Sequence, residues 1–528
     1  MKKLRKKFEV FYVYPLVSGF LLFLSFPKMD FFFFAWIALV PLLVALYNQN
    51  NWTAFRMGFL AGLVYFFGTT YWIYHSINVY GSVPFLTSLL IVLILCFYLS
   101  LYPALFSLLF SLTIKKTHLP VMCVAPLFWT ALEFVRSYAL TGFPWSSLGY
   151  SQYKFLPFIQ IADITGIYGV SFLLVAFNGA LADMLLLKTR RYERPLYPLL
   201  PTIVSFALVV ALTFFTFSYG FYRLHNKGTG TDIKVAIVQG NIEQDEKWDR
   251  AYQQSVISVY KDLSLEAAKQ NPVLIVWPET SVPFYFSYDK ELSDDLISFQ
   301  KSLNAYLLFG SVLVKKDVRA YASVPSPEIK TGQGEPGYTN SAVLLDKDGK
   351  VSYIYDKMHL VPFGEYVPLR KVLFFIEKLV FGIGDYIPGS SYIKAITPFG
   401  TFGTLICYEI IFPGLVRKFY TSGGDFIVTI TNDAWFGRTS GPYQHFSMAV
   451  FRAIENRKPV IRAANTGISG VIDSAGRILS KTDLFNRTVL ITDIKTDRSL
   501  TIYTKYGDIL SYLCIVFSLL LLFKNWSK

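Results

Sequence analysis

The sequence predicts a polytopic α-helical membrane domain joined to an α/β domain, and three observations support this fold class. Hydrophobic residues make up 53% of the chain and charged residues only 16%, whereas a soluble domain carries about 25% charged residues. Apolar residues are dense over 1–220 and mixed with polar ones afterwards. Short β-rich runs then alternate with amphipathic helical patterns. We therefore expect a membrane domain at 1–220, an α/β domain at 221–506, and a last membrane helix with a short tail at 507–528.

Charge and cysteine usage narrow the possible classes of protein. The formal net charge is +14, but the basic residues lie beside hydrophobic spans and form no stripe with interleaved aromatic side chains, so we expect no nucleic-acid partner. Only one of the four cysteines, Cys407, lies in the polar region. A disulfide framework is therefore not expected there, and Cys407 is either a small buried side chain or a nucleophile.

The apolar segments have the length of membrane spans. A bilayer core about 30 Å thick needs about 20 apolar residues per helix. Eight such segments are present, at 9–27, 30–47, 54–74, 84–112, 119–140, 164–187, 196–220 and 507–523. The opening MKKLRKK before an apolar run is also typical of a signal peptide, but the run is long and SFPKMD offers no small-residue cleavage site. An uncleaved first helix is therefore favoured.

Basic residues between the spans predict the orientation. The segments MKKLRKK, IKKTH, KTRRYER and FKNWSK share one side of the membrane when eight spans are threaded. Lys and Arg are enriched in cytoplasmic loops. Both termini should therefore lie in the cytoplasm, with 221–506 on the opposite side, outside the cytoplasmic membrane.

Three residues in the membrane half each have two interpretations. Glu133 and Arg136 are three residues apart and so share a helix face; a structural pair is favoured over a lipid-headgroup site. Trp145 lies in the loop TGFPWSSLGYSQ (141–152) at the outer boundary, where tryptophan often anchors a membrane protein. An interface anchor is favoured over a substrate contact.

The polar half predicts a layered α/β domain with a mixed sheet. Buried strands are expected at 233–239, 273–277, 305–314, 402–407, 426–431 and 460–465. The helix after the first strand should bury Val256, Tyr260, Leu263 and Ala267. Turn sequences at 346–350 and 473–477 predict hairpins. No GxxxxGK[ST] phosphate loop is present, so no nucleotide cofactor is expected.

Polar residues follow these strands at the points where chemistry is usually placed in α/β sheets. Glu279 follows one strand and Cys407 another, while Lys357 lies in YDKMHLVPFGEYVP and Asn432 and Asp433 follow a third strand. Each has a structural explanation by itself, such as a helix cap, a solvated charge or a turn. Together, a carboxylate, an ammonium group and a thiol are suited to acyl transfer through a thioester.

The roles follow from the chemistry of each group. A thiol is weakly ionised at neutral pH and needs a neighbouring base or positive charge. Glu279 is the expected base, and Lys357 is expected to stabilise an oxyanion. A Cys-His pair with His359 or His445 is the alternative that spacing leaves open.

The motifs WPET, YDKMHLVPFGEYVP and CYEIIFPG resemble the nitrilase (carbon-nitrogen hydrolase) superfamily. Further phrases, VQGNIEQDEKW, TNDAWFGRTSGPYQH, RAANTGISG and GFPWSSLGYSQ, are similar to the apolipoprotein N-acyltransferase family, which acts last in bacterial lipoprotein maturation. The resemblance implies an α-β-β-α sandwich on a helical membrane domain, no metal or cofactor, and a ping-pong reaction. It also implies a phospholipid acyl donor and a diacylglyceryl apolipoprotein acceptor; we further expect a monomer.

The resemblance also assigns residues. It implies a Glu-Lys-Cys triad of Glu279, Lys357 and Cys407, as general base, oxyanion-stabilising cation and acylated nucleophile. Supporting or substrate-binding positions are Glu365, Glu409, Tyr408 and Trp248, with Trp145 as a further candidate. Glu243 stands where proline is expected and Lys458 where arginine is common, and neither departure touches the triad.

Two other functions and one further element complete the expectations. A membrane-tethered nitrilase-type amidase would use the same triad with water as acceptor. A transporter would show more polar or broken sites within its spans than these do. The apolar stripe in KVLFFIEKLVFGIGDY (371–386) is either buried packing or, as we favour, a lid that dips into the outer leaflet.

Overall fold

The computed structural model describes residues 9–47, 49–117, 119–188, 199–225, 230–244, 251–315, 337–366 and 386–526. The chain divides into two compact units, which are described separately. A helical unit comprises Met1–His75, Pro84–Asn226 and Tyr506–Lys528. An α/β unit comprises Ser76–Val83 and Lys227–Lys505.

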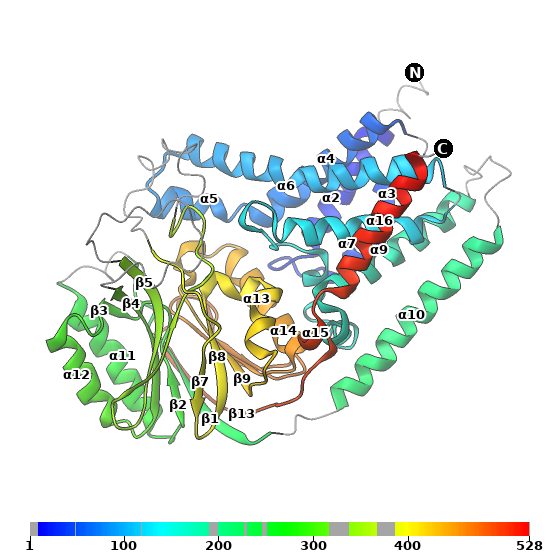
Figure 1. Ribbon diagram of the computed structural model, residues 1–528. Helices are drawn as coiled ribbons and strands as arrows, with labels where there is room; N and C mark the ends of the chain where they lie inside the picture. The colour runs from blue at the N-terminus through cyan, green and yellow to red at the C-terminus, as the bar shows by residue number, and fades with distance from the viewer. Residues whose placement is uncertain are drawn as a thin grey trace. The chain divides into compact units, whose positions relative to one another are not determined.

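A helix lies in each of the eight apolar segments of the helical unit (Figure 1). The longer ones are α2 (Tyr14–Leu24), α3 (Val40–Leu46), α4 (Asn51–Thr70), α6 (Phe85–Ile114), α7 (Val121–Arg136), α9 (Ala162–Lys188), α10 (Leu199–His225) and α16 (Ile509–Trp526). Short helical turns are η1 (Glu9–Val13), η2 (Phe32–Trp36), α5 (Ile73–His75), η3 (Ser76–Tyr80, grouped with the α/β unit), η4 (Ala139–Thr141), η5 (Leu148–Gln152) and α8 (Leu156–Ile159).

The structure does not confirm the predicted eight spans. Among the described residues, three helices are long and apolar enough to cross a membrane, at Phe85–Ile114, Ala162–Lys188 and Thr202–His225. Apolar helices at Phe11–Leu24, Phe32–Leu46 and Ile509–Lys524 are shorter. The second predicted span is broken into a 3-10 turn and a seven-residue helix. The length of a continuous apolar segment therefore overestimates the length of the regular helix that forms within it.

The charged pair of α7 holds the following loop. Glu133 accepts hydrogen bonds from Trp129 Nε1 (3.0 Å) and from the backbone N–H of Leu148 (2.7 Å). Arg136 donates to the carbonyl oxygen of Trp145 (2.7 Å) and to Ser147 Oγ (3.2 Å). These contacts tie the loop to the helix, so both charges have the structural role that the sequence favoured.

Trp145, which we expected to be an interface anchor, has a buried side chain. Its side chain is only 1% exposed, and its ring centroid lies 4.7 Å from that of Trp72 in the same unit. Arg136 fixes its backbone carbonyl. Trp145 is thus a buried packing residue of the helical unit, because its loop folds back against the helices.

The first sheet of the α/β unit has seven strands among the described residues. They are β1 (Asp232–Gln239), β2 (Leu274–Val276), β3 (Val282–Tyr285), β4 (Tyr306–Lys315), β5 (Gly337–Leu345), β6 (Val351–Asp356) and β13 (Thr488–Lys495). The order is β13-β1-β2-β4-β5-β6, and β3 pairs with β4. Strands β1, β2 and β4 are parallel, whereas β13, β5 and β6 join antiparallel.

In the described part of the chain, the second sheet has six strands. They are β7 (Lys394–Thr397), β8 (Gly400–Ile406), β9 (Phe426–Thr431), β10 (Val460–Ala464), β11 (Gly470–Ile472) and β12 (Ile478–Lys481), in the order β12-β11-β10-β9-β8-β7. Strands β8, β9 and β10 are parallel, so their carboxyl ends share one edge. All six predicted strands and both predicted hairpins are confirmed, but the strands form two mixed sheets.

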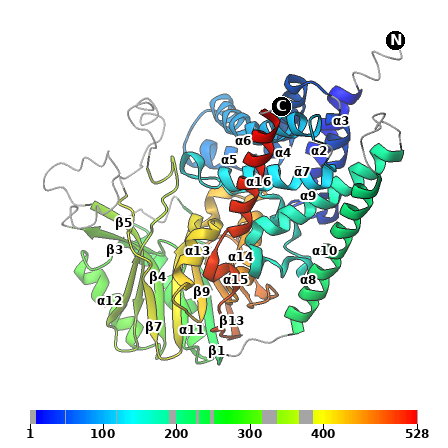
Figure 2. The same cartoon turned by 45° about the vertical axis from the view of Figure 1, so that its right-hand side comes forward.

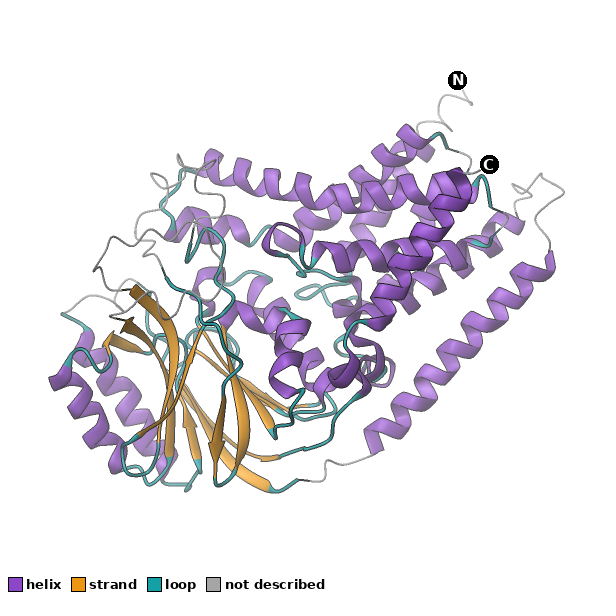
Figure 3. Ribbon diagram, viewed as in Figure 1, coloured by secondary structure: helices purple, strands orange, loops and turns teal. Residues whose placement is uncertain are grey.

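Helices cover the outer faces of the two sheets, and every described strand lies in this unit (Figure 3). Helices α11 (Gln253–Ala268) and α12 (Lys290–Lys301) pack on the first sheet. Helices α13 (Pro413–Tyr420) and α14 (Gly441–Asn456) accompany the second sheet (Figure 2), and α15 (Ile502–Tyr506) follows β13. Between the sheets, the rings of Tyr353 and Phe402 lie 6.1 Å apart. The α/β unit is thus layered α-β-β-α.

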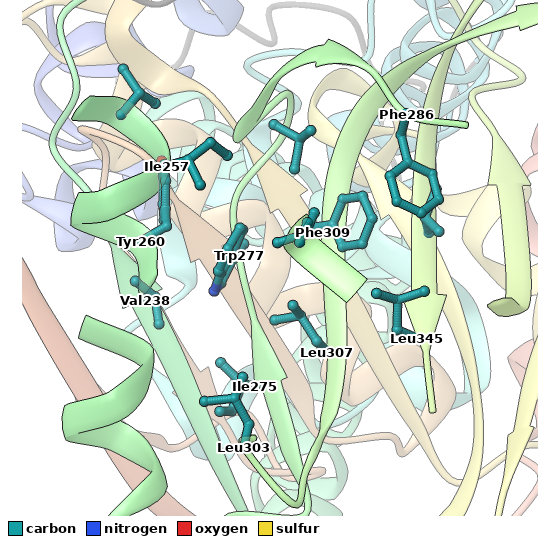
Figure 4. Close-up of a cluster of buried hydrophobic side chains, with 14 of the residues drawn as sticks. Val238, Ile257, Tyr260, Ile275, Trp277, Phe286, Leu303, Leu307, Phe309 and Leu345 are labelled. Carbon is teal, nitrogen blue, oxygen red and sulfur yellow. The ribbon is translucent and has the colours of Figure 1, made fainter. Parts of the chain in front are cut away.

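The apolar core beneath α11 shows why the sequence pattern predicts this packing (Figure 4). Val256, Tyr260 and Ala267 are buried as expected, and Leu263 packs partly buried against them. Trp277 stacks on Tyr260 with ring centroids 5.0 Å apart. Because Trp277 continues β2 and is immobilised here, it fixes the start of the loop that carries Glu279.

Candidate active site

The three residues expected to act together follow three different strands. Glu279 lies shortly after β2, Lys357 directly after β6 and Cys407 directly after β8. Their side chains are buried, with exposed fractions of 6%, 1% and 8%. Charged and nucleophilic groups are seldom buried without partners, so the partners decide what this cluster can do.

Glu279 is held on both carboxylate oxygens. Its Oε1 accepts a hydrogen bond from Asn340 Nδ2 (2.8 Å) and lies 3.5 Å from Lys357 Nζ. Its Oε2 accepts from the backbone N–H of Asn432 (2.9 Å). The Glu279 loop approaches β4 at Gly310, where a Cβ atom would lie 2.7 Å from the Cα of Glu279. A glycine within that strand is therefore required for this approach.

Lys357 is a buried ammonium group between two carboxylates. Its Nζ donates to Glu365 Oε1 over 2.9 Å and lies 3.5 Å from Glu279 Oε1. Burial alone lowers the pKa of Lys357, but Glu365 and Glu279 outweigh burial and hold this pKa above its ordinary value. The group therefore stays positively charged at neutral pH.

Cys407 has a strained backbone and a protonated thiol. Its φ of +52° lies in the left-handed region, which costs an L-residue about 1–2 kcal/mol. Burial and the Glu279 carboxylate raise the pKa of the thiol, and Lys357 opposes them only in part. The thiol is therefore neutral at rest, and it needs a base to become a nucleophile.

Glu409 joins the nucleophile to the Lys357 loop. Its Oε2 accepts from the backbone N–H of Ile406 (2.7 Å), just before Cys407. Its Oε1 accepts from Tyr355 OH (2.7 Å) and from the backbone N–H groups of Met358 (2.7 Å) and His359 (3.1 Å). Burial raises the pKa of Glu409 to about 7 against these donors. This one carboxyl group therefore ties the end of β8 to the loop after β6.

Sequence reasoning missed Asn340 on β5. Its Nδ2 donates to Glu365 Oε1 (2.9 Å) as well as to Glu279 Oε1 (2.8 Å). It thus bridges two carboxylates that would otherwise repel each other. The available signal was the polar run Thr339–Asn340–Ser341 just before the apolar stretch AVLL, because buried polar side chains need hydrogen-bond partners.

The two histidines are placed unfavourably for a Cys-His pair. The ring of His359 lies 3.9 Å from that of Phe412, and burial together with Lys357 lowers the pKa of His359 to about 4. His445 directs Nε2 at the carbonyl oxygen of Cys407 (3.2 Å) and Nδ1 at Asp433 (3.0 Å). The geometry therefore favours Glu279 as the base.

The other candidate residues fall in three places. Tyr408 packs with its ring centroid 5.1 Å from that of Phe412, next to the nucleophile. Trp248 lies outside the described residues, as does the expected lid at 371–386 apart from Tyr386. Trp145 belongs to the helical unit. Across the described parts of the chain, no group of three His, Cys, Asp or Glu side chains is arranged to hold a metal ion.

Comparison with known proteins covers both halves of the chain. Residues 18–180 match the family described as Apolipoprotein N-acyltransferase N-terminal domain, and residues 234–502 match Carbon-nitrogen hydrolase. The apolipoprotein N-acyltransferase of Geobacter metallireducens is 42% identical over 96% of this chain and 93% of its own. Those of Pasteurella multocida and Chlorobaculum tepidum are 32% and 31% identical over 97% and 95% of this chain and 94% of their own.

Proposed function

This chain belongs to the apolipoprotein N-acyltransferase family, and from that premise we propose how its residues carry out the reaction. The enzyme moves a fatty acyl group from a phospholipid to the α-amine of the N-terminal diacylglyceryl-cysteine of apolipoproteins. The acyl group is held between the two steps as a thioester on Cys407. The observation that carries this proposal is that Glu279, Lys357 and Cys407 are buried at the ends of three strands, with Lys357 Nζ 3.5 Å from Glu279 Oε1.

In the first step, Glu279 takes the proton of the Cys407 thiol as the sulfur attacks the carbonyl carbon of a phospholipid ester. Negative charge develops on the carbonyl oxygen, and Lys357 stabilises it. The bond between the carbonyl carbon and the glycerol oxygen then breaks. Glu279 returns the proton to that oxygen, so a lysophospholipid leaves and the thioester remains.

In the second step, the free α-amine of the acceptor attacks the thioester carbonyl. The amine loses a proton to Glu279, the carbon–sulfur bond breaks, and the proton passes to the departing sulfur of Cys407. The products are an amide and the original thiol. This step runs downhill because an amide is more stable than a thioester. The mechanism is ping-pong because the acyl-enzyme forms, and the lysophospholipid leaves, before the acceptor reacts.

The supporting residues have separate proposed roles. Glu365 balances the charge of Lys357, and Glu409 positions the loop that carries Lys357 relative to the nucleophile. Tyr408 packs beside the nucleophile, where it contacts substrate, and Trp248 is a proposed contact for the lipid substrates. Trp145, which is buried, packs within the helical unit instead. No cofactor or metal takes part.

The membrane topology remains a proposal that the sequence supports. Eight spans would place both termini in the cytoplasm and the catalytic domain, 221–506, on the periplasmic side of the inner membrane. Both the donor phospholipid and the acceptor lipoprotein are embedded in the bilayer. The membrane domain, 1–220 with 507–528, therefore serves to hold the catalytic domain at the membrane where its substrates are. The enzyme is proposed to act as a monomer.

Mass spectrometry of the intact protein tests the mechanism. Wild-type protein mixed with phospholipid and no acceptor should gain one acyl mass on the peptide that contains Cys407, and neutral hydroxylamine should remove it. An unmodified Cys407 peptide, under conditions in which an acceptor is still acylated, would refute the covalent route. Release of ammonia from small amides at a comparable rate would instead favour the amidase, which uses the same triad with water.

A further inference from the structure

A buried polar cluster lies behind the nucleophile and has no part in the mechanism above. It consists of Asp433, His445 and Arg462, whose side chains are 1%, 0% and 0% exposed. Asp433 follows β9, Arg462 lies in β10 and His445 lies in α14. Burying three ionisable groups is costly unless each has a defined partner, so the contacts that hold them are informative.

The contacts fix the position of one proton. A carbonyl oxygen only accepts, so His445 Nε2, which lies 3.2 Å from the Cys407 carbonyl oxygen, must carry a proton. Arg462 Nη2 lies 3.0 Å from His445 Nδ1 and donates to Asp433 Oδ2 over 2.8 Å. Burial and Arg462 lower the pKa of His445. Nε2 therefore donates to the Cys407 carbonyl oxygen, and Nδ1 faces both Asp433 Oδ1 and Arg462 Nη2, each 3.0 Å away.

The Cys407 backbone needs such support on both sides. Its left-handed φ of +52° is unfavourable for a residue with a side chain. Glu409 holds the preceding peptide through the N–H of Ile406, and His445 holds the carbonyl that follows. With one anchor removed, the backbone can relax toward an ordinary conformation, and the thiol then turns relative to Glu279 and Lys357.

We propose that His445 is a positioning residue for the nucleophile, which it holds through the backbone carbonyl of Cys407 while Arg462 and Asp433 fix its ring and tautomer. This inference rests on the proposed function, because the thiol matters only if it is acylated. It assigns no proton transfer to His445. It predicts that what matters at position 445 is a donor at the place of Nε2.

Two substitutions of similar polarity separate this role from a general structural one. The amide nitrogen of a glutamine reaches the place of Nε2, whereas that of an asparagine reaches only as far as Nδ1. His445→Gln should therefore acylate Cys407 within about tenfold of the wild-type rate. His445→Asn should be slower by roughly 10²-fold, because a misplacement near 1 Å costs about that much. The phospholipid KM should change little in either variant.

The measurement is the rate of acyl-enzyme formation at saturating phospholipid, with thermal unfolding of each variant recorded in the same detergent. Equal losses in both variants, or losses that follow their melting temperatures, would overturn the inference. The inference would also be overturned if His445→Gln were as inactive as Cys407→Ala and its residual rate no longer fell at acidic pH. That result would make His445 the base.

A second readout needs no phospholipid. Alkylation of the Cys407 peptide by iodoacetamide should be fastest in wild type, slower in His445→Gln and slowest in His445→Asn. If wild-type protein forms no acyl-enzyme but keeps this order of alkylation, the proposed function fails and the positioning role stands. If the acyl-enzyme forms but alkylation and acylation are alike in all three proteins, only the positioning role fails.

Discussion

Replacing Lys357 with methionine should reveal how much of the site is held together by one charge. The ammonium group is 1% exposed, donates to Glu365 over 2.9 Å and lies 3.5 Å from Glu279. Methionine fills a similar volume without charge or donor. Two buried carboxylates are then left with only the amide of Asn340 between them.

The expected magnitudes follow from these contacts. Removing one partner of a buried charge pair costs about 3–5 kcal/mol, which corresponds to a fall of roughly 6–20 °C in the melting temperature of a domain near this size. Losing a preorganised oxyanion-stabilising group costs about 10²- to 10³-fold in rate. Lys357→Met should therefore be both less stable and nearly unable to form the acyl-enzyme.

A second substitution separates the two losses. Adding Glu365→Gln to Lys357→Met removes the surplus carboxylate, so part of the lost stability should return. The recovery should be incomplete, since Glu365 accepts from Asn340 Nδ2 at Oε1 (2.9 Å) and from the N–H of Val361 at Oε2 (2.7 Å), and a glutamine has only one accepting oxygen for these two donors. Acylation should stay low in the double variant, because the charge that stabilises the oxyanion is still missing.

The assay pairs thermal unfolding in detergent with acyl-enzyme formation measured by mass. Lys261→Met is the control, since Lys261 pairs with Asp295 over 2.6 Å in a partly exposed site away from the catalytic cluster. It should lose at most about 1 kcal/mol and keep its acylation rate. Recovery of acylation in the double variant would refute the oxyanion role of Lys357, and an undiminished melting temperature in the single variant would refute the buried network.

Three further outcomes are expected. Glu279→Gln should slow acylation of Cys407 by roughly 10²- to 10⁴-fold at an unchanged phospholipid KM, and a normal acylation rate measured by mass would exclude Glu279 as the base. Burial raises the pKa of Glu409 from 4.5 to about 7, so the protonated carboxyl group stabilises the native state. This stabilisation is complete below pH 4.5 and is lost as the pH rises through 7. As the pH increases from 4.5 to 7, the melting temperature of wild type should therefore fall relative to that of Glu409→Gln, by the equivalent of about 3 kcal/mol in unfolding free energy. A rise would mean that the four hydrogen-bond donors to Glu409 outweigh its burial. Lys347→Cys, in the exposed turn between β5 and β6, should react with an impermeant maleimide from outside the inner membrane. Labelling only after permeabilisation would reverse the proposed orientation. Gly349 in the same turn is an unsuitable labelling position, because its φ is +79° and a Cβ would meet Ile297.

Local pattern was enough to place most strands, and it failed where pairing depends on distant residues. The run 426–431 is predicted and observed as β9 without any shift, because six consecutive apolar or β-branched residues bounded by turns leave few alternatives. The division into two sheets was not predicted from periodicity, since strand order depends on contacts between segments far apart in the chain. Strand β13 was missed because most of its residues are only partly buried and show no clear alternation.

The candidate site divides in the same way. Glu279, Lys357 and Cys407 were noticed because each follows an apolar run, and strand ends are local features. Asn340 was not, because its importance depends on the β4–β5 register, which pairs it with Val312 beside the Glu279 loop. The role of His445 was equally hidden, since nothing in the sequence tells whether its ring faces a thiol or a backbone carbonyl.

The charge balance of the site explains why the thiol keeps its proton until substrate arrives. Lys357 contacts two carboxylates, Glu279 and Glu365, so the cluster already holds one more negative charge than positive. A resting thiolate at Cys407 would add another in a buried place, which is why burial and Glu279 raise the pKa of the thiol. Transfer of the proton to Glu279 moves the negative charge without adding to it. As the sulfur then attacks, that charge passes to the oxyanion, where Lys357 stabilises it. The same arrangement that keeps the free enzyme unreactive therefore favours the transition state, because the charge is redistributed among groups that are already fixed in position.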